Sequence, residues 1–132
     1  MWLLDNEPVT DIDSVYSGFV YLITNLKSNR KYIGKKILKF KKTKIVKGKK
    51  KRYLVESDWR DYWSSSDELK SDVELLGEDN FRREILRLCK GKGELAYWEA
   101  KYQFEFDVLY KPKEFYNGWI FVKVRKIGRA HV

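Results

Sequence analysis

Cysteine and histidine are almost absent from the sequence, which contains one of each, Cys89 and His131. A single cysteine cannot form an intrachain disulfide or a cysteine-based zinc site. His131 is the next-to-last residue of the sequence, a poor position for the base of a serine or cysteine triad. The sequence therefore argues against zinc centres and against hydrolases that use such a triad.

Long apolar runs are missing as well. The longest are short, such as Phe19-Val20-Tyr21-Leu22-Ile23, whereas a membrane-spanning helix needs about 20 apolar residues. The first five residues contain Asp5 and no base, although a secretory signal carries base there. We therefore expect a protein that is not exported and makes no membrane contact, in the reducing cytoplasm.

The charge of the chain is strongly uneven. The 132 residues suffice for one compact domain and carry a net charge of +9. Residues 1–13 hold four acids and no base, residues 14–55 hold fourteen bases and no acid, and the remainder is nearly balanced. Such an excess favours a polyanionic partner, most simply nucleic acid. Composition alone does not choose among DNA, RNA and an anionic membrane.

The basic block has two interpretations. It is either a solvated lysine-rich loop or a basic hairpin, because apolar residues such as Phe40 and Ile45 recur inside it and Lys47-Gly48-Lys49 marks a turn. We favour a hairpin insertion at about residues 35–56 that lies along a nucleic-acid groove. Its expected contacts are Lys35, Lys39, Lys41, Lys42, Lys44, Lys47, Lys49, Lys50, Lys51 and Arg52, with Arg82 and Arg83 as secondary phosphate contacts or as solvated strand residues.

Local patterns predict an α+β fold, a small, mainly antiparallel β-sheet flanked by helices. We expect strands at 18–24, from Lys31, at 81–88 and at 119–124. Ser65 and Glu68 form a capping-box pattern for a helix that ends at Gly77. A second helix is expected from Glu94, with apolar residues at intervals of three or four, to a stop before Pro112. Residues 1–17 are interpreted as an acidic extension ahead of a domain at 18–132.

The remaining reactive side chains suit phosphodiester cleavage. Tyrosine, lysine, arginine, glutamate and asparagine can position a water, neutralise phosphate charge and hold one hard cation. A phenol is a poor base at neutral pH because its pKa is about 10. We expect Lys35 and Lys36, just beyond Tyr32, to lower that pKa.

Two tyrosine motifs carry a family resemblance. Gly18-Phe19-Val20-Tyr21, ten intervening residues and Tyr32-Ile33-Gly34 resemble the paired signature of the GIY-YIG nucleases, with Phe-Val-Tyr as the first tripeptide. Downstream, Ser64-Ser65-Ser66 before a helix resembles the second segment of that family. Glu99 resembles its helical metal-binding glutamate, and Asn117 its terminal asparagine.

The resemblance covers roughly residues 17–124 and is closest to phage-type homing endonucleases with a basic insertion. It implies a DNA endonuclease that uses one Mg²⁺ or Mn²⁺ ion, in the host cytoplasm if phage-encoded. Tyr21 would activate the water, Tyr32 would position the water or the phosphate, and Glu99 would bind the metal. The family has an arginine after YIG that holds phosphate. Arg60 is the first candidate here and Lys36 the second.

Each residue also has a structural interpretation. Both tyrosines could be ordinary strand aromatics, Glu99 could face solvent, and Asn117-Gly118 could be a turn. Arg60 could pair with nearby acids. Two other functions stay open, a non-catalytic basic DNA binder on the same scaffold and an RNA-associated structural protein. For an endonuclease acting on duplex DNA, sequence specificity would come from the basic insertion, from residues 1–17 or from a partner protein, and a homodimer on DNA could be needed to break both strands.

Overall fold

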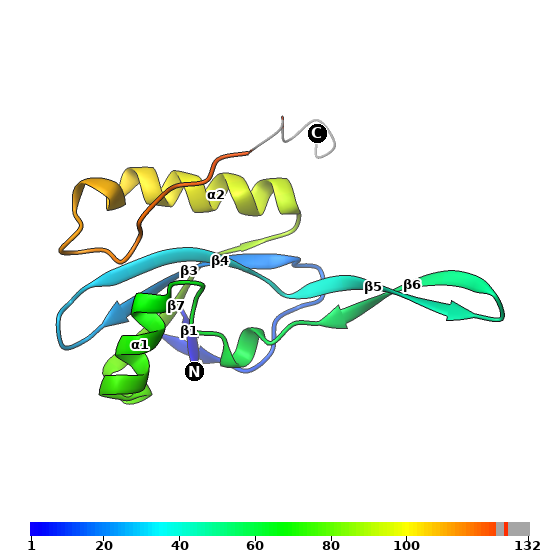
Figure 1. The fold of residues 1–132 in the computed structure, drawn as a ribbon, viewed down its shortest axis with the longest axis horizontal. Helices are drawn as coiled ribbons and strands as arrows, with labels where there is room; N and C mark the ends of the chain where they lie inside the picture. The colour runs from blue at the N-terminus through cyan, green and yellow to red at the C-terminus, as the bar shows by residue number, and fades with distance from the viewer. Residues whose placement is uncertain (124–125, 127–132) are drawn as a thin grey trace.

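The computed structural model describes residues 1–123 and 126, which form a five-stranded sheet, two α-helices and a separate two-stranded ribbon (Figure 1). The strand order in the sheet is β2-β1-β7-β3-β4. All pairings are antiparallel except that of β1 with β7. The expected α+β fold with helices on a mainly antiparallel sheet is confirmed.

The elements have the following bounds. The sheet contains β1 (Trp2–Leu4), β2 (Glu7–Val9), β3 (Gly18–Asn25), β4 (Lys31–Ile37) and β7 (Phe81–Cys89). The ribbon contains β5 (Lys39–Val46) and β6 (Lys49–Glu56). The helices are α1 (Asp67–Leu76) and α2 (Lys92–Glu105), and short 3₁₀ turns occur at η1 (Trp59–Asp61), η2 (Glu78–Asn80) and η3 (Val108–Tyr110).

Strand β3 is buried on both faces, which explains its nearly continuous apolar sequence. Phe19, Tyr21 and Ile23 belong to the core beneath α1. Val20 belongs to the second core, beneath α2. The sheet thus separates two cores, and its last strand, β4, has an outer edge where groups from both faces can meet.

The acidic segment 1–17 contributes to the sheet. β1 pairs with the edge of β7 that faces away from β3, in parallel register. Trp2 is buried, and its indole Nε1 donates a hydrogen bond to the Trp59 carbonyl at 2.7 Å. The segment that we interpreted as an extension therefore supplies a strand and a large core side chain.

The helix ends differ from expectation. The capping residue of α1 is Ser66, whose hydroxyl accepts from the Leu69 amide at 3.3 Å, so the assignment to Ser65 was wrong. Ser65 is left free for another contact. Helix α2 ends at Glu105, before the expected stop at Pro112, because Asp107 adopts a left-handed φ of 52°.

The expected last strand at 119–124 was wrong for residues 119–123, which have no regular structure, and Val124 lies outside the described residues. Phe115 forms a single bridge to Lys31 on the outer edge of β4. Beyond it, the side chain of Asn117 rather than a backbone ladder bonds that edge. Side chains replace the strand that the aromatic and β-branched composition had suggested.

No helix within the described part of the chain is long and apolar enough to cross a bilayer.

Candidate active site

A pocket of about 370 Å³ lies at the outer edge of β4. Tyr32 of β4, Ser65 and Ser66 before α1, and Glu99 and Gln103 of α2 line it, together with the segment from Tyr116 to Trp119. Four parts of the chain that are far apart in sequence therefore meet at one place. Tyr32, Glu99 and Asn117, all expected site residues, are among them.

The Tyr32 ring reaches this pocket from the α1 face of the sheet. Its hydroxyl is hydrogen-bonded to the Ser65 hydroxyl, with the oxygens 3.1 Å apart. Burial raises the pKa of Tyr32, and the nearby charge of Glu99 raises that pKa further, while the contact with Ser65 opposes the shift. Tyr32 is thus a protonated phenol that opens onto the pocket.

Tyr21 lies behind Tyr32, with the two ring centroids 6.1 Å apart, and is only 1% exposed. Its ring passes directly over Gly34, where an added Cβ would lie 2.4 Å from the phenol oxygen Oη. The glycine of the Tyr32-Ile33-Gly34 motif is therefore needed because any larger residue would collide with Tyr21. The pKa of Tyr21 is raised well above its usual value. Burial is the largest cause, and the neighbouring Tyr62, Tyr32 and Glu99 raise this pKa further.

The expectation that neighbouring lysines lower these phenol pKa values was wrong. Lys35 points to the opposite face of the sheet, where its Nζ lies 3.9 Å from Glu99 Oε1. Lys36 pairs with Asp58 at 2.7 Å and covers the ring of Tyr62. Because carboxylates already engage both ammonium groups, desolvation dominates the pKa of each phenol.

Glu99 lies on α2 and lines the pocket from the other face. Its side chain is mostly buried, and this burial raises its pKa, while Lys35 acts in the opposite direction. Since the Glu99 charge contributes to the pKa of both tyrosines, the three groups share one electrostatic environment. The interpretation of Glu99 as a solvent-facing residue was wrong, because its side chain is only 16% exposed.

Asn117 acts as a clamp on β4. Its Oδ1 accepts from the Ile33 amide at 3.1 Å, and its Nδ2 donates to the Ile33 carbonyl at 2.8 Å. Gln103 donates a further hydrogen bond to the same carbonyl at 2.9 Å. Both side chains fix the backbone between Tyr32 and Gly34 and thereby set the direction of the Tyr32 ring.

Comparison with known families shows which family the chain belongs to. The chain matches the family described as "Putative endonuclease segE, GIY-YIG domain" over residues 2–120. It belongs to the GIY-YIG nuclease family. No curated protein and no solved structure matches the chain. The matched span includes β1 and the acidic N-terminal residues, and family membership supports a nuclease function.

Neither candidate for the phosphate-holding residue of the GIY-YIG family reaches the pocket. Arg60 lies in η1, where its guanidinium pairs with Asp11 at 2.8 Å and with Glu56. It therefore lines a different depression, and the structural interpretation of Arg60 fits better. Lys36 is on β4, but its ammonium group pairs with Asp58 on the face of the sheet that α1 covers. Two cations contact residues that line this pocket: Lys35 Nζ lies 3.9 Å from Glu99 Oε1, and the Arg30 guanidinium lies 4.3 Å from the ring centre of Tyr116.

Arg82 and Arg83 of β7 also differ from expectation. Arg83 is 5% exposed and lies between the rings of Trp2 and Trp63, with its Nη1 donating to the carbonyl of Tyr62 at 2.8 Å. A phosphate cannot reach it, so its assignment as a phosphate contact was wrong. Arg82 pairs with Glu84 and Asn6.

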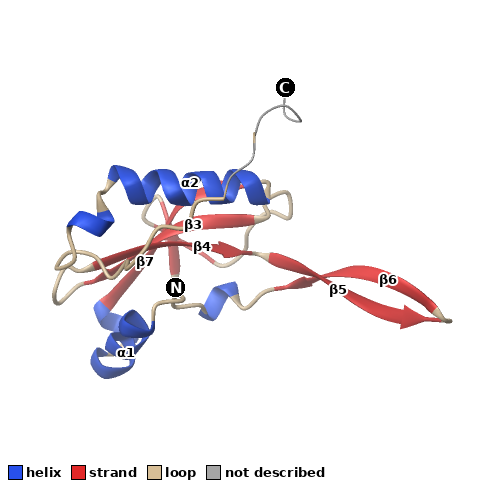
Figure 2. Ribbon diagram, turned by 45° about the horizontal axis from the view of Figure 1, so that its top comes forward, coloured by secondary structure: helices blue, strands red, loops and turns tan. Residues whose placement is uncertain are grey.

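The interpretation of the basic block as a hairpin is confirmed. β5 and β6 pair in full register and are joined by a two-residue turn at Lys47 and Gly48. Both turn residues have positive φ, 53° and 75°, as in the turns that match the twist of a hairpin. The ribbon projects away from the GIY-YIG core (Figure 2). Its nine bases are Lys39, Lys41, Lys42, Lys44, Lys47, Lys49, Lys50, Lys51 and Arg52.

Two carboxylates line this pocket, Asp67 at the start of α1 and Glu99 of α2, and the mostly buried Glu99 is the better candidate for holding a metal ion. Among the described residues, no group of three or more histidine, cysteine, aspartate or glutamate side chains could surround an ion. Mg²⁺ commonly keeps several waters and uses only one or two protein carboxylates, so a single glutamate beside an open pocket fits it. The Oε1 atom of Gln103, one helical turn along α2, is buried without a hydrogen-bond partner among the described residues.

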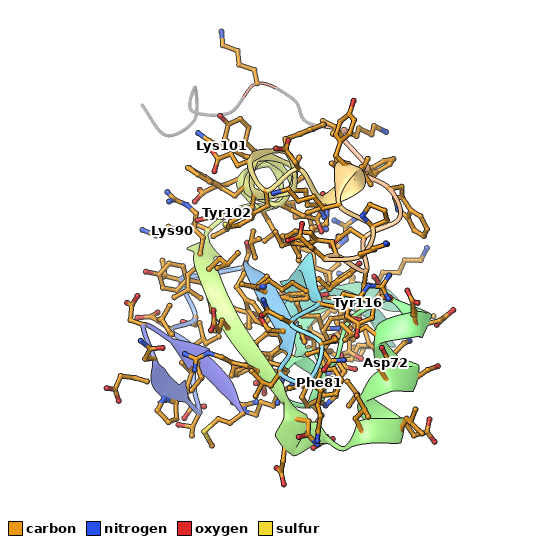
Figure 3. All side chains as sticks on the ribbon, turned by 90° about the vertical axis from the view of Figure 1, so that its left-hand side faces the viewer. Asp72, Phe81, Lys90, Lys101, Tyr102 and Tyr116 are labelled. Atoms are coloured by element: carbon orange, nitrogen blue, oxygen red, sulfur yellow. The ribbon has the colours of Figure 1, made fainter. Side chains whose placement is uncertain are left out.

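Sequence reasoning missed three residues of the site. Gln103 lies four residues after Glu99 on the same helix face, and that spacing is the signal that could have found it. Tyr116 lines the pocket and donates to Asp72 of α1 at 2.7 Å, which ties the C-terminal segment to that helix (Figure 3). Ser65 was noticed as a helix cap, and no sequence signal indicated its contact with Tyr32.

A larger depression of about 610 Å³ lies between η1 and α1. Four carboxylates, those of Asp58, Asp61, Glu74 and Glu78, line it. Their negative charge makes it unsuitable for a phosphate, and neither tyrosine of the motif reaches it. The smaller pocket is therefore the better candidate for a nuclease site.

Proposed function

We propose that this GIY-YIG family protein is a divalent-metal-dependent endonuclease that hydrolyses phosphodiester bonds in duplex DNA with one metal ion. One observation carries the proposal. Tyr32 and Glu99 come from opposite faces of the sheet and open onto the same pocket at the edge of β4. A phenol and a carboxylate at one open site suit the positioning and charge neutralisation that phosphate hydrolysis needs.

Glu99 would hold the metal ion, Mg²⁺ or Mn²⁺. When bound, such an ion supplies positive charge that stabilises the phosphate and the departing oxygen. Glu99 must be ionised to bind it, and Lys35 favours that form by lowering the carboxyl pKa against the effect of burial. Lys35 contacts Glu99 and does not itself line the pocket, so its role here is to support the ionised form of Glu99 rather than to hold the phosphate.

The two phenols have different places and therefore different roles in this proposal. Tyr32 faces the pocket and positions the attacking water or a phosphate oxygen with its hydroxyl. The family resemblance implies that Tyr21 accepts the proton of the water, but Tyr21 is 1% exposed and does not line the pocket, so in this proposal Tyr32 is the phenol that touches the water. Tyr21 supports the Tyr32 ring from behind.

The test is cleavage of supercoiled plasmid with Mg²⁺ or Mn²⁺, followed by mapping of the cut ends. The parent and Glu105→Gln should cut, and Glu99→Gln should not. Glu105 is a matched control because it is an exposed glutamate on the same helix. If Glu99→Gln cuts as well as the parent, the assignment fails.

Two outcomes would favour the other candidate functions. Salt-sensitive DNA binding without cleavage under any divalent ion would indicate a non-catalytic binder. Tighter binding to folded RNA than to duplex DNA would indicate an RNA-associated protein. One pocket cuts one strand at a time, so the mapped ends also report whether two copies act together.

A further inference from the structure

The two faces of the β5–β6 ribbon have different chemistry. In an antiparallel pair, residues that oppose each other point to the same face. One face, which we call the lysine face, carries Phe40, Lys42, Lys44, Val46, Lys49, Lys51, Tyr53 and Val55. The other, which we call the mixed face, carries Lys39, Lys41, Thr43, Ile45, Lys50, Arg52, Leu54 and Glu56. Each face has four bases, and the faces differ in that the mixed face also has a guanidinium, a threonine hydroxyl and the acid Glu56.

The aromatic rings of the lysine face are covered by its own cations. Lys42 Nζ lies 5.4 Å from the ring centre of Phe40, and Lys44 Nζ lies 5.1 Å from that of Tyr53. Lys44 and Lys51 are directly opposed, and like charges in that position destabilise a strand pair, since this face carries no acid. Binding of anions such as phosphates would therefore stabilise this face, whose lysines lie on both β5 and β6.

The mixed face exposes apolar side chains beside hydrogen-bond donors. Ile45 is 74% exposed and Leu54 is 61% exposed. Thr43 and Arg52 oppose each other between them, and Arg52 has no ion-pair partner among the described residues. Methyl groups and a guanidinium are the groups that contact thymine methyls and guanine edges in DNA.

We propose that the ribbon enters the major groove of B-form DNA with its mixed face toward the base edges, where Thr43, Ile45, Arg52 and Leu54 read sequence. The four lysines of the lysine face, two on β5 and two on β6, reach the phosphates on both sides of the groove. The choice of duplex DNA as partner rests on the proposed function. The ribbon thereby supplies the sequence specificity of the enzyme.

The dimensions of the ribbon select this groove. Two paired strands lie about 4.8 Å apart, and with side chains they fit a groove about 12 Å wide but not one about 6 Å wide. The major groove of an RNA duplex is deep and narrow and does not admit a ribbon. The ribbon has nine bases and only one acid, Glu56, so its net positive charge suits a groove lined by phosphates.

The length of the ribbon also limits how far from the cleavage site its base contacts can lie. Lys39, at the ribbon base, is seven residues from Tyr32, and Val46, at its far end, is fourteen residues away. At no more than about 3.6 Å per residue, the far end lies within roughly 50 Å of the pocket. This distance corresponds to about 15 base pairs at 3.4 Å each. Since one ribbon leaves one end of β4, the contacts of one protein copy fall on one side of its cut (Figure 1).

Two neighbouring residues of β6 provide a matched test. Arg52 lies on the mixed face and Lys51 on the lysine face, and both are exposed and positively charged. A duplex is first selected from a random DNA library by binding to the full-length parent. Affinity of the parent, Arg52→Ser and Lys51→Ser is then measured for that duplex and for a scrambled one.

We expect Arg52→Ser to reduce discrimination between the two duplexes about tenfold or more. Lys51→Ser should weaken binding to both equally and lower the slope of log affinity against log salt by about one. Equal, sequence-independent losses for both variants would overturn the proposal, as would failure of the selection to enrich any sequence.

Methylation interference on the selected duplex identifies the groove. Methylation of guanine N7, in the major groove, should block binding on one side of the cut. Interference at adenine N3, in the minor groove, would contradict the proposal. Cleavage of the same duplex is scored separately. Groove-specific binding without cleavage refutes only the proposed function, and cleavage without such binding refutes only the ribbon's role.

Discussion

At the scale of single residues, burial controls the chemistry of the site. Tyr21, Tyr32 and Glu99 all have raised pKa values, and desolvation is the largest cause for each. The phenols stay protonated at neutral pH, whereas Glu99 is placed where its charge costs stability but remains available to a cation. A carboxylate kept in such a position is typical of functional sites.

This cost predicts how stability depends on pH. Because burial raises the pKa of Glu99, the folded protein binds its proton more tightly than the unfolded chain does. The free energy of unfolding therefore falls as pH rises through this pKa. We expect Glu99→Gln to melt at a higher temperature than the parent at pH 7, with the difference lost below about pH 4. Equal melting temperatures at pH 7 would mean that Glu99 carries no such cost.

The contact between Gly34 and Tyr21 predicts a second single-residue effect. An added methyl group at Gly34 would collide with the Tyr21 phenol, and overpacking of this kind costs about 1–3 kcal/mol. We expect Gly34→Ala to lose that much unfolding free energy in urea denaturation. Gly118→Ala, which has nothing within 4 Å of the new atom, is the control and should change stability by less than about 0.5 kcal/mol. Similar losses in both would exclude the collision.

At the scale of elements, the edge of β4 is held by side chains rather than by another strand. Asn117 bonds both backbone groups of Ile33, and Gln103 bonds one of them. This closure leaves room for the pocket, which a continuous strand at 119–123 would have covered. The end of the sheet is thus open where Tyr32 emerges.

The two amide side chains should therefore differ in importance. Asn117→Leu leaves the Ile33 amide without a partner, which costs about 1–3 kcal/mol. Gln103→Leu leaves the Ile33 carbonyl still bonded to Asn117 and removes the unpartnered Oε1, so we expect a loss below about 1 kcal/mol. The check is chemical denaturation of both variants, and the reverse order would contradict the clamp.

Regular elements could be predicted from the sequence, whereas the contacts between them could not. The strands at 18–24 and 81–88 and the end of α1 at Gly77 follow from local composition and turn residues. Arg60 was misassigned because its partners Asp11 and Glu56 lie in other segments. The strand at 119–123 was wrong because β-prone composition does not show whether an edge is already occupied. Tyr32, Glu99 and Asn117 were found by family resemblance, and only the fold brings them together.

At the scale of the whole molecule, charge and core are separated. The excess of bases lies on a ribbon that projects from the sheet, and the two hydrophobic cores contain none of its residues (Figure 2). A ribbon of two strands adds little to stability. Folding and attraction of DNA are therefore carried by different parts of the chain, which predicts that they can be separated.

Replacement of residues 41–54 by Asn-Gly tests this separation. The new turn joins Phe40 to Val55, which are already paired, and removes eight of the nine ribbon bases. We expect the melting temperature to stay within a few degrees of the parent, because no core residue is lost. The slope of log affinity against log salt concentration should become shallower by about 0.9 for each phosphate contact that is lost, and so by several units in total. A large fall in melting temperature would show that the ribbon supports the fold.

The central claim is that Tyr32 and Glu99 act on one phosphate in one pocket. Single-turnover cleavage of an end-labelled duplex by the parent, Tyr32→Phe, Glu99→Gln and the double variant tests it most directly. Residues that act as a unit have non-additive effects, so the double variant should be no slower than about the slower single variant. A Tyr32→Phe rate equal to that of the parent, or a double-variant loss equal to the product of the two single losses, would contradict the claim.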